Sequence, residues 1–179
     1  MGFRSTALAW LGVGAAALAT PAWAGKAHEH GVAQLDIGVE PSRVSLILDT
    51  PLDNVLGYER APRSDAERAA ADALLAKLRA GDTLIRIDGQ AACGAPKVEI
   101  KAPVLEPGAA GKDAKDGHAD LEAVWDFPCK SGAKAGFVDL GGLFDALPRL
   151  KRVNIQIATP RGQMKAVLTR GNTRIRLAR

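Results

Sequence analysis

Alternation of apolar and polar side chains is the feature that most restricts how this chain can fold. The segment GVAQLDIGV (31–39) has apolar residues at every second position, with Gln34 and Asp36 between them. ADLEAVWDFPC (119–129) repeats the pattern, with Trp125 in its apolar set. Because successive side chains of a strand point to opposite faces, this period predicts strands that bury one face. The chain is therefore expected to form a sheet with one face in a core.

Other segments complete the predicted sheet. The turn-like EPSR (40–43) joins the first strand to VSLILD (44–49), which predicts a hairpin at the start of the fold. Further strands are expected at 83–88, 97–102, 151–159, 163–169 and 173–177. Few helical segments lie between neighbouring strands, so a mostly antiparallel sheet is favoured over a parallel one.

One main helix is expected at about 64–80. Ser64 is followed three residues later by Glu67, which matches a capping box, and Gly81 stands where such a helix would end. A short second helix is predicted at about 141–147. Together with the strands, these helices predict the α+β class.

Two stretches are expected to form loops. Residues 50–63 contain Pro51 and Pro62, which interrupt a helix. Residues 103–117 are rich in Gly, Lys and Asp and have almost no large apolar side chains, which predicts a flexible loop. Residues 25–179 are expected to form a single domain of ordinary size.

The first 24 residues have the three parts of a secretory signal peptide. Arg4 supplies the positive start, an apolar run covers residues 7–19, and Ala22-Trp23-Ala24 fits the small-x-small cleavage rule. The apolar run is shorter than the roughly 20 residues that cross a bilayer, so no membrane insertion is expected after cleavage. In a bacterial cell the mature chain would then be periplasmic.

The charge pattern argues against a nucleic-acid partner. Loss of the signal removes Arg4 alone, which leaves 23 basic and 20 acidic side chains and a net charge of +3. The densest basic stretches are the short RLKR (149–152) and TRIRLAR (173–179), and aromatic residues make up 4% of the chain. Nucleic-acid surfaces combine basic clusters with stacking rings, and this sequence has neither in quantity.

Cys93 and Cys129 are the two cysteines of the chain. An even cysteine count in an exported protein predicts one disulfide. A redox or metal-binding thiol pair is the alternative, but the C-x-x-C spacing that favours it is missing. A disulfide between residues 36 apart would stabilise the fold by roughly 4 kcal/mol in the chain-entropy model.

Histidines are the strongest candidates for chemistry, because no nucleophile, phosphate-binding or dinucleotide motif is present and no enzyme is expected. His28 and His30 directly precede the first predicted strand, and His118 precedes the strand at 119–129. In an extended chain His28 and His30 would project to the same side, away from the core. Zn²⁺ is usually four-coordinate, so three histidines with a carboxylate such as Asp120, or with water, would hold it.

Two alternatives accompany this zinc hypothesis. Cleavage after Gly25 would place His28 third in the chain, where the amine, two amides and the imidazole suit square-planar Cu²⁺. That cut would put Trp23 where small residues are preferred, so copper is less favoured than zinc. Alternatively, His28 and His30 are solvated residues of a frayed terminus with no ligand at all.

Four blocks of the chain resemble the zinc-regulated periplasmic proteins of the ZrgA type. They are AHEHGVAQLDIGVE, DTPLDNVLGYERAPRSDAER, GHADLEAVWDFPC and LFDALPRLKRVNIQIATPRGQMKAVLT, in the same order, and the resemblance extends from His28 to about Leu177. It implies an exported zinc-binding component of zinc acquisition that is produced when zinc is scarce and is encoded alongside transport machinery.

The resemblance assigns residues and also marks departures. His28 and His30 match the leading His-Glu-His of the family, and His118 matches the histidine before its ADL strand. The family often has a histidine-rich stretch where this chain has EPGAAGKDAKDG, and Arg60 stands where histidine is frequent. Glu59 is a further candidate ligand if its loop reaches His28.

The expected function is a periplasmic zinc-binding protein that scavenges zinc or delivers it to an inner-membrane metal transporter. The rival hypothesis is a periplasmic adaptor that docks a transport complex through a sheet edge or the Trp125 face, without a metal site of its own. A zinc hydrolase, with three histidines and an open coordination position, ranks third.

Overall fold

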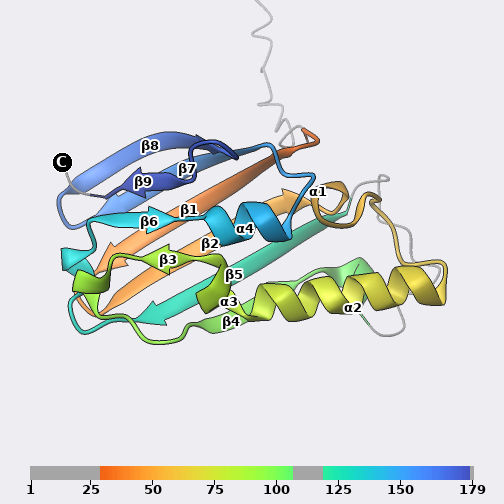
Figure 1. Ribbon diagram of the computed structural model, residues 1–179, viewed down its shortest axis with the longest axis horizontal. Helices are drawn as coiled ribbons and strands as arrows, with labels where there is room; N and C mark the ends of the chain where they lie inside the picture. Colours follow the sequence, from red (N-terminus) through yellow and green to blue (C-terminus); the bar gives the residue numbers. More distant parts are fainter. Residues whose placement is uncertain (1–28, 107–118, 178–179) are drawn as a thin grey trace, which may run out of the picture.

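The computed structural model of the protein describes residues 29–106 and 119–177, and its main element is a six-stranded sheet (Figure 1). The strand order is β4-β5-β2-β1-β7-β8, and every neighbouring pair is antiparallel except β1 and β7, which are parallel. The strands are β1 (Val32–Glu40), β2 (Arg43–Pro51), β4 (Lys97–Lys101), β5 (Asp120–Pro128), β7 (Arg152–Thr159) and β8 (Gly162–Thr169). The predicted opening hairpin and the mostly antiparallel sheet are confirmed.

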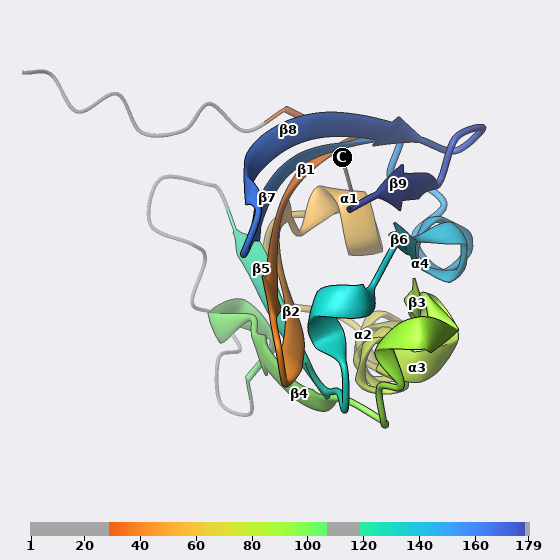
Figure 2. The same ribbon diagram turned by 90° about the vertical axis from the view of Figure 1, so that its left-hand side faces the viewer.

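A second, smaller layer covers one face of this sheet. It consists of the three-stranded sheet β3-β6-β9 and four α-helices. These elements are β3 (Arg86–Ile87), β6 (Phe137–Asp139), β9 (Arg174–Arg176), α1 (Asp53–Leu56), α2 (Asp65–Arg79), α3 (Gly81–Leu84) and α4 (Gly141–Ala146). Figure 2 shows the large sheet curving around this layer, which places the core between the two and confirms the α+β class.

The alternating residues supply the sheet's half of the core. In β1, Leu35 and Ile37 are almost fully buried, whereas Gln34 and Asp36 are exposed on the other face. In β5, Trp125 is completely buried, and its indole N–H donates to the carbonyl of Leu78 in α2 at 2.9 Å. The prediction that these strands bury one face is therefore confirmed. Trp125 lies in the core and is unavailable as a docking surface.

The main helix begins as its sequence predicts. The Ser64 hydroxyl accepts from the backbone N–H of Glu67 at 3.2 Å, so Ser64 is the N-cap of α2. The second half of the capping box differs, because the Glu67 carboxylate accepts from the backbone N–H of Arg63 at 2.7 Å. Gly81 follows the helix end, but it opens α3 and lies so close to the Trp125 ring that a β-carbon there would be 2.4 Å from it.

Several short elements differ from the prediction. The expected loop at 50–63 contains the single helical turn α1, and the expected strand at 83–88 is reduced to β3 because residues 83 and 84 belong to α3. The predicted loop at 103–117 opens with a 3₁₀ turn, Pro103–Leu105, whose Val104 and Leu105 are buried, and its residues from 107 onward lie outside the described residues. Strand β6 has no counterpart in the prediction. The second helix, α4, agrees with the predicted 141–147.

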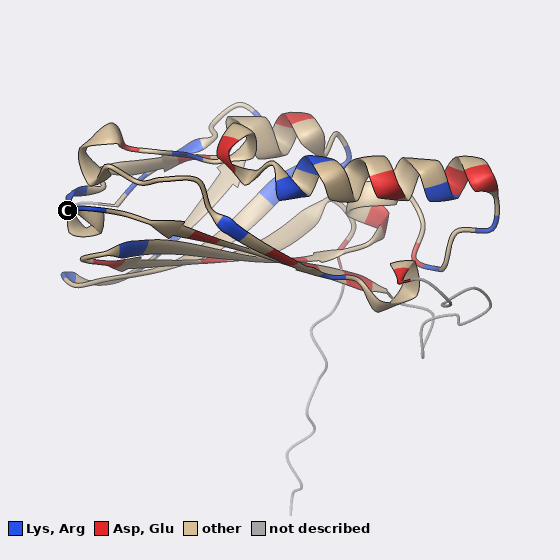
Figure 3. Ribbon diagram, turned by 90° about the horizontal axis from the view of Figure 1, so that it is seen from below, with Lys and Arg blue, Asp and Glu red and all other residues tan. Residues whose placement is uncertain are grey.

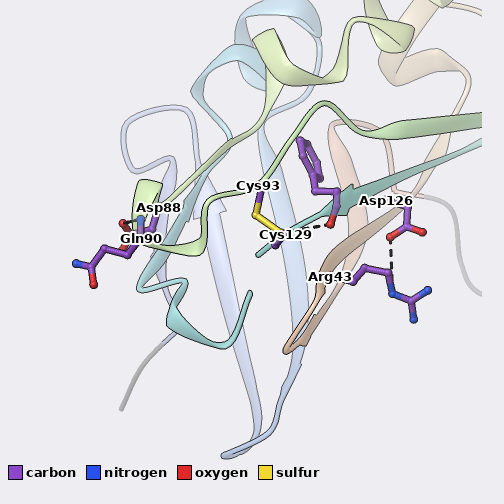
Figure 4. The surroundings of a disulfide bond; sticks show 7 residues. Arg43, Asp88, Gln90, Cys93, Asp126 and Cys129 are labelled. Carbon is purple, nitrogen blue, oxygen red and sulfur yellow. Dashed lines mark hydrogen bonds and ion pairs between the residues drawn. A yellow bond between two sulfur atoms is a disulfide. The ribbon is translucent and has the colours of Figure 1, made fainter. Parts of the chain in front are cut away.

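Cys93 and Cys129 form the predicted disulfide, with an S–S distance of 2.04 Å (Figure 4). The two residues are an isolated antiparallel bridge, so the bond connects the chain after β3 to the end of β5. The sulfur of Cys129 is buried beside the carbonyl of Phe127. The bond thus fastens the small layer to the end of the large sheet that lies farthest from the start of β5.

Basic and acidic residues are mixed along the helices and strands. Figure 3 shows basic and acidic residues interspersed along α2 and along the strands, in keeping with the mixed charge pattern of the sequence. Within 29–106 and 119–177, none of the helices has the length and apolar character that a membrane span requires.

Candidate metal site

The His-Glu-His segment enters the described structure as a tight turn. The backbone N–H of Val32 donates to the carbonyl of Glu29 at 3.0 Å, and Gly31 between them has φ +86°. A β-carbon on Gly31 would also lie 3.0 Å from Cδ of Lys151. His30 therefore lies in a turn and not in a strand, and its alignment with His28 stays a prediction. His28 lies outside the described residues.

Strand β7 fixes this turn from one side. The carbonyl of Gly31 accepts from the backbone N–H groups of Lys151 and Arg152 at 2.8 and 3.0 Å. The Arg152 guanidinium also donates to both carboxylate oxygens of Glu29, at 3.1 and 3.0 Å. The central residue of the His-Glu-His motif is thus bound to β7, a role that nothing in the sequence pattern indicated.

Two carboxylates face the ring of His30 from the other side. Nε2 of His30 is 3.2 Å from Oε1 of Glu59, and Nδ1 is 3.8 Å from Oδ2 of Asp53. The side chains of Glu59 and Asp53 are only 11% and 15% exposed, whereas that of His30 is 63% exposed. An imidazole open to solvent therefore lies beside two largely buried carboxylates.

Helix α1 explains why these carboxylates lie together. Asp53 opens the helix, and Gly57 ends it with φ +86°, which reverses the chain and brings Glu59 back toward His30. Arg149 packs over Gly57 and its Nη2 is 3.3 Å from Oδ1 of Asp53. Asp53 is thus oriented by an arginine on one oxygen, while the other oxygen faces the histidine. Nothing in the sequence pattern indicated this role of Asp53.

The start of β5 returns the chain to the same place. The backbone N–H of Leu52, directly before Asp53, donates to the carbonyl of Ala119 at 2.7 Å. Asp120 follows, exposed, and pairs in register with Pro51. Figure 1 shows the start of β1, α1 and the start of β5 at one end of the large sheet. His118, the residue before Ala119, lies outside the described residues.

The structure therefore joins some of the predicted site residues. His30 and Glu59 are in contact, and the turn of His30, helix α1 and Ala119 meet at one sheet end. Within the described ranges, no group of three His, Cys, Asp or Glu side chains is arranged to hold one ion. The three-histidine set itself depends on His28 and His118.

Arg60, where the family often has histidine, serves the fold. Its guanidinium donates to both carboxylate oxygens of Glu67 at 2.8 Å and stacks on the ring of Tyr58. The Arg60 hydrogen bond, followed by that of the Arg63 backbone N–H, lowers the pKa of Glu67 to about 2. The residue after Glu59 is thereby tied to α2, which holds this stretch of chain in place.

Comparison with known protein families identifies the family of the chain. No curated protein sequence matches the chain. The family model described as "ZrgA family zinc uptake protein" matches residues 27–177, a range that includes all three histidines and every described residue. This match confirms the resemblance seen in the sequence. The chain belongs to the ZrgA family of zinc uptake proteins.

Proposed function

We propose that the protein binds Zn²⁺ in the periplasm and takes part in zinc uptake, by scavenging the ion or by delivering it to an inner-membrane metal transporter. The observation that carries this proposal is the contact of His30 with Glu59 at the sheet end where the chain returns from His118. Membership of a zinc uptake family supports the choice of metal.

The proposed ligands are His28, His30 and His118, with Glu59 as the fourth. Zinc bonds of about 2.0–2.1 Å at tetrahedral angles separate neighbouring ligand atoms by about 3.3 Å. The 3.2 Å between Nε2 of His30 and Oε1 of Glu59 is close to that separation, so the two atoms already lie at the spacing that two ligands of one zinc ion require. Asp120 is the alternative carboxylate, because it lies two residues after His118.

Asp53 has a supporting role in this proposal. Metal-bound histidines commonly donate their second ring N–H to a carboxylate, which fixes the tautomer and the ring orientation. Oδ2 of Asp53 faces Nδ1 of His30, and Arg149 holds Asp53 through its other oxygen. A shorter contact than the present 3.8 Å is expected once zinc binds Nε2.

The ligand set also bears on the other hypotheses. A site of imidazoles and a carboxylate suits zinc and does not involve the terminal amine that the Cu²⁺ arrangement needs. We propose no enzymatic activity, since four protein ligands would leave no open position for a catalytic water. An adaptor docking through a sheet edge remains the rival, and it differs in needing no zinc in isolation.

Calorimetric titration of the tag-free 25–179 protein with Zn²⁺ tests the proposal. One site is expected, and Glu59→Gln should weaken it about tenfold or more, because amide oxygen is a poorer zinc ligand than carboxylate. Glu40→Gln is the matched control, since Glu40 lies at the far end of β1 and pairs with Arg43. Absence of zinc binding by the wild-type chain would contradict the proposal and favour the adaptor.

A further inference from the structure

Asn54 is unusual among the polar residues that the structure describes. Asn54 and Thr50 are the two buried polar residues in that part of the chain, each with 0% exposure. Burying an amide is costly unless its hydrogen bonds are replaced. The partners of Asn54 therefore indicate what its burial achieves.

Its amide group connects helix α1 to the His30 turn. Oδ1 of Asn54 accepts from the backbone N–H of Gly31, and Nδ2 donates to the carbonyl of Val32 at 2.8 Å. Nδ2 also donates to the hydroxyl of Thr50 at 3.0 Å. Two N–H donors and one acceptor on a short side chain are needed here, and of the standard residues only asparagine provides them at this length.

Asn54 and Gly31 each lie next to a residue of the candidate metal site. Asn54 directly follows Asp53, and Gly31 directly follows His30. The hydrogen bond between Asn54 and Gly31 therefore sets how far the His30 ring lies from the carboxylates of Asp53 and Glu59. The side chain of His30 itself is 63% exposed.

We propose that Asn54 is a positioning residue of the metal site. Its hydrogen bonds hold the His30 turn against α1, so that Nε2 of His30 and the carboxylate of Glu59 are already in contact before the ion binds. The consequence for affinity rests on the proposed function, whereas the positioning itself does not. Residues that orient metal ligands typically change metal affinity 10- to 100-fold when they are removed, and a loss in that range is expected here.

The positioning is tested without metal. Nuclear Overhauser contacts between the His30 ring and the Glu59 side chain should be present in the metal-free wild type and lost in Asn54→Ala. Thr50→Val is the matched control, because it removes a buried hydrogen-bond partner of Asn54 but leaves the contacts to Gly31 and Val32 intact. Persistence of the His30–Glu59 contacts in folded Asn54→Ala would overturn the proposal. If that variant does not fold, Asn54→Leu removes the same hydrogen bonds while keeping the volume.

A zinc titration of the same variants separates positioning from general destabilisation. Asn54→Ala should weaken zinc binding about 10- to 100-fold, and Thr50→Val less than about twofold. In a His30→Ala background, Asn54→Ala should cause almost no further loss, because it acts through His30. An equal loss in both backgrounds would mean that Asn54 acts on the whole fold. If the wild type binds no zinc while Asn54→Ala still loses the His30–Glu59 contacts, the proposed function fails and the positioning role stands.

Discussion

At the scale of single residues, Glu29 and His30 of the His-Glu-His motif contact different parts of the fold. Glu29 binds Arg152 on β7, and His30 faces the carboxylates of Asp53 and Glu59. This division depends on Gly31, whose positive φ turns the chain between the two contacts. The conformation of Gly31 thus determines the direction in which the His30 side chain points.

Gly31→Ala is therefore expected to cost stability and to disturb the site. Its φ of +86° disfavours any residue with a β-carbon by roughly 1–2 kcal/mol, and the new methyl group would press on Lys151. Urea denaturation should show a free energy of unfolding lower by about that amount. Gly89→Ala is the control, because a β-carbon there meets nothing within 4 Å, and it should change stability by less than about 0.5 kcal/mol. Equal stability of the two variants would contradict this account of the turn.

At the scale of elements, the small sheet is organised around one carboxylate. Asp139 at the end of β6 accepts from the backbone N–H of Gly141 in α4, from the Thr173 hydroxyl, and from Arg86 and Arg174 on the neighbouring strands. Burial alone would raise the pKa of Asp139, but these hydrogen bonds outweigh it and lower the pKa to about 2. The charged carboxylate is therefore the form that holds β3, β6, β9 and α4 together.

This linkage predicts how Asp139→Asn depends on pH. A carboxyl group whose pKa is lower in the folded state contributes stability above its ordinary pKa near 3.8 and loses it as pH falls toward 2. The free energy of unfolding of the wild type should be about 1–2 kcal/mol higher than that of Asp139→Asn at pH 6, and this difference should shrink between pH 4 and pH 2. Urea denaturation at several pH values measures it. A difference independent of pH would mean that the charge of Asp139 is not what binds these elements.

The elements also differ in how far their sequences predict them. The strands β1 and β5 and the helix α2 carry long periodic patterns or a cap, and their types were predictable. The four-residue helices α1 and α3 and the short strand β6 have too few residues for a period, and tertiary contacts such as Asn54 to Gly31 hold α1 in place.

The site follows the same division. The three histidines and Glu59 could be proposed as ligands from the sequence, because their residue types suit zinc. The Asp53 contact and the Gly31 turn could not, because they arise from a chain reversal at Gly57 and from pairing with β7.

At the scale of the whole molecule, the disulfide and the candidate metal site lie at opposite ends of the large sheet. Ala119 adjoins the site just before β5 begins, and Cys129 follows directly after β5 ends. A nine-residue strand spans about 26 Å between its first and last residues at about 3.3 Å per residue. The bond constrains the unfolded chain, and it touches neither His30 nor the segment that carries Asp53 and Glu59.

Stability and zinc binding should therefore respond differently to loss of the disulfide. In a Cys93→Ala/Cys129→Ala double variant, the free energy of unfolding should fall by up to roughly 4 kcal/mol, since the crosslink spans a sequence separation of 36. The zinc dissociation constant of the folded variant should change less than about twofold, because the His30 turn, α1 and the start of β5 are held by contacts that do not involve the bond. Urea denaturation and calorimetric titration of the same preparation measure both quantities. A large loss of zinc affinity in a variant that is still folded would show that the two sheet ends are coupled, and that the site depends on the closure of the whole sheet and not on its local contacts alone.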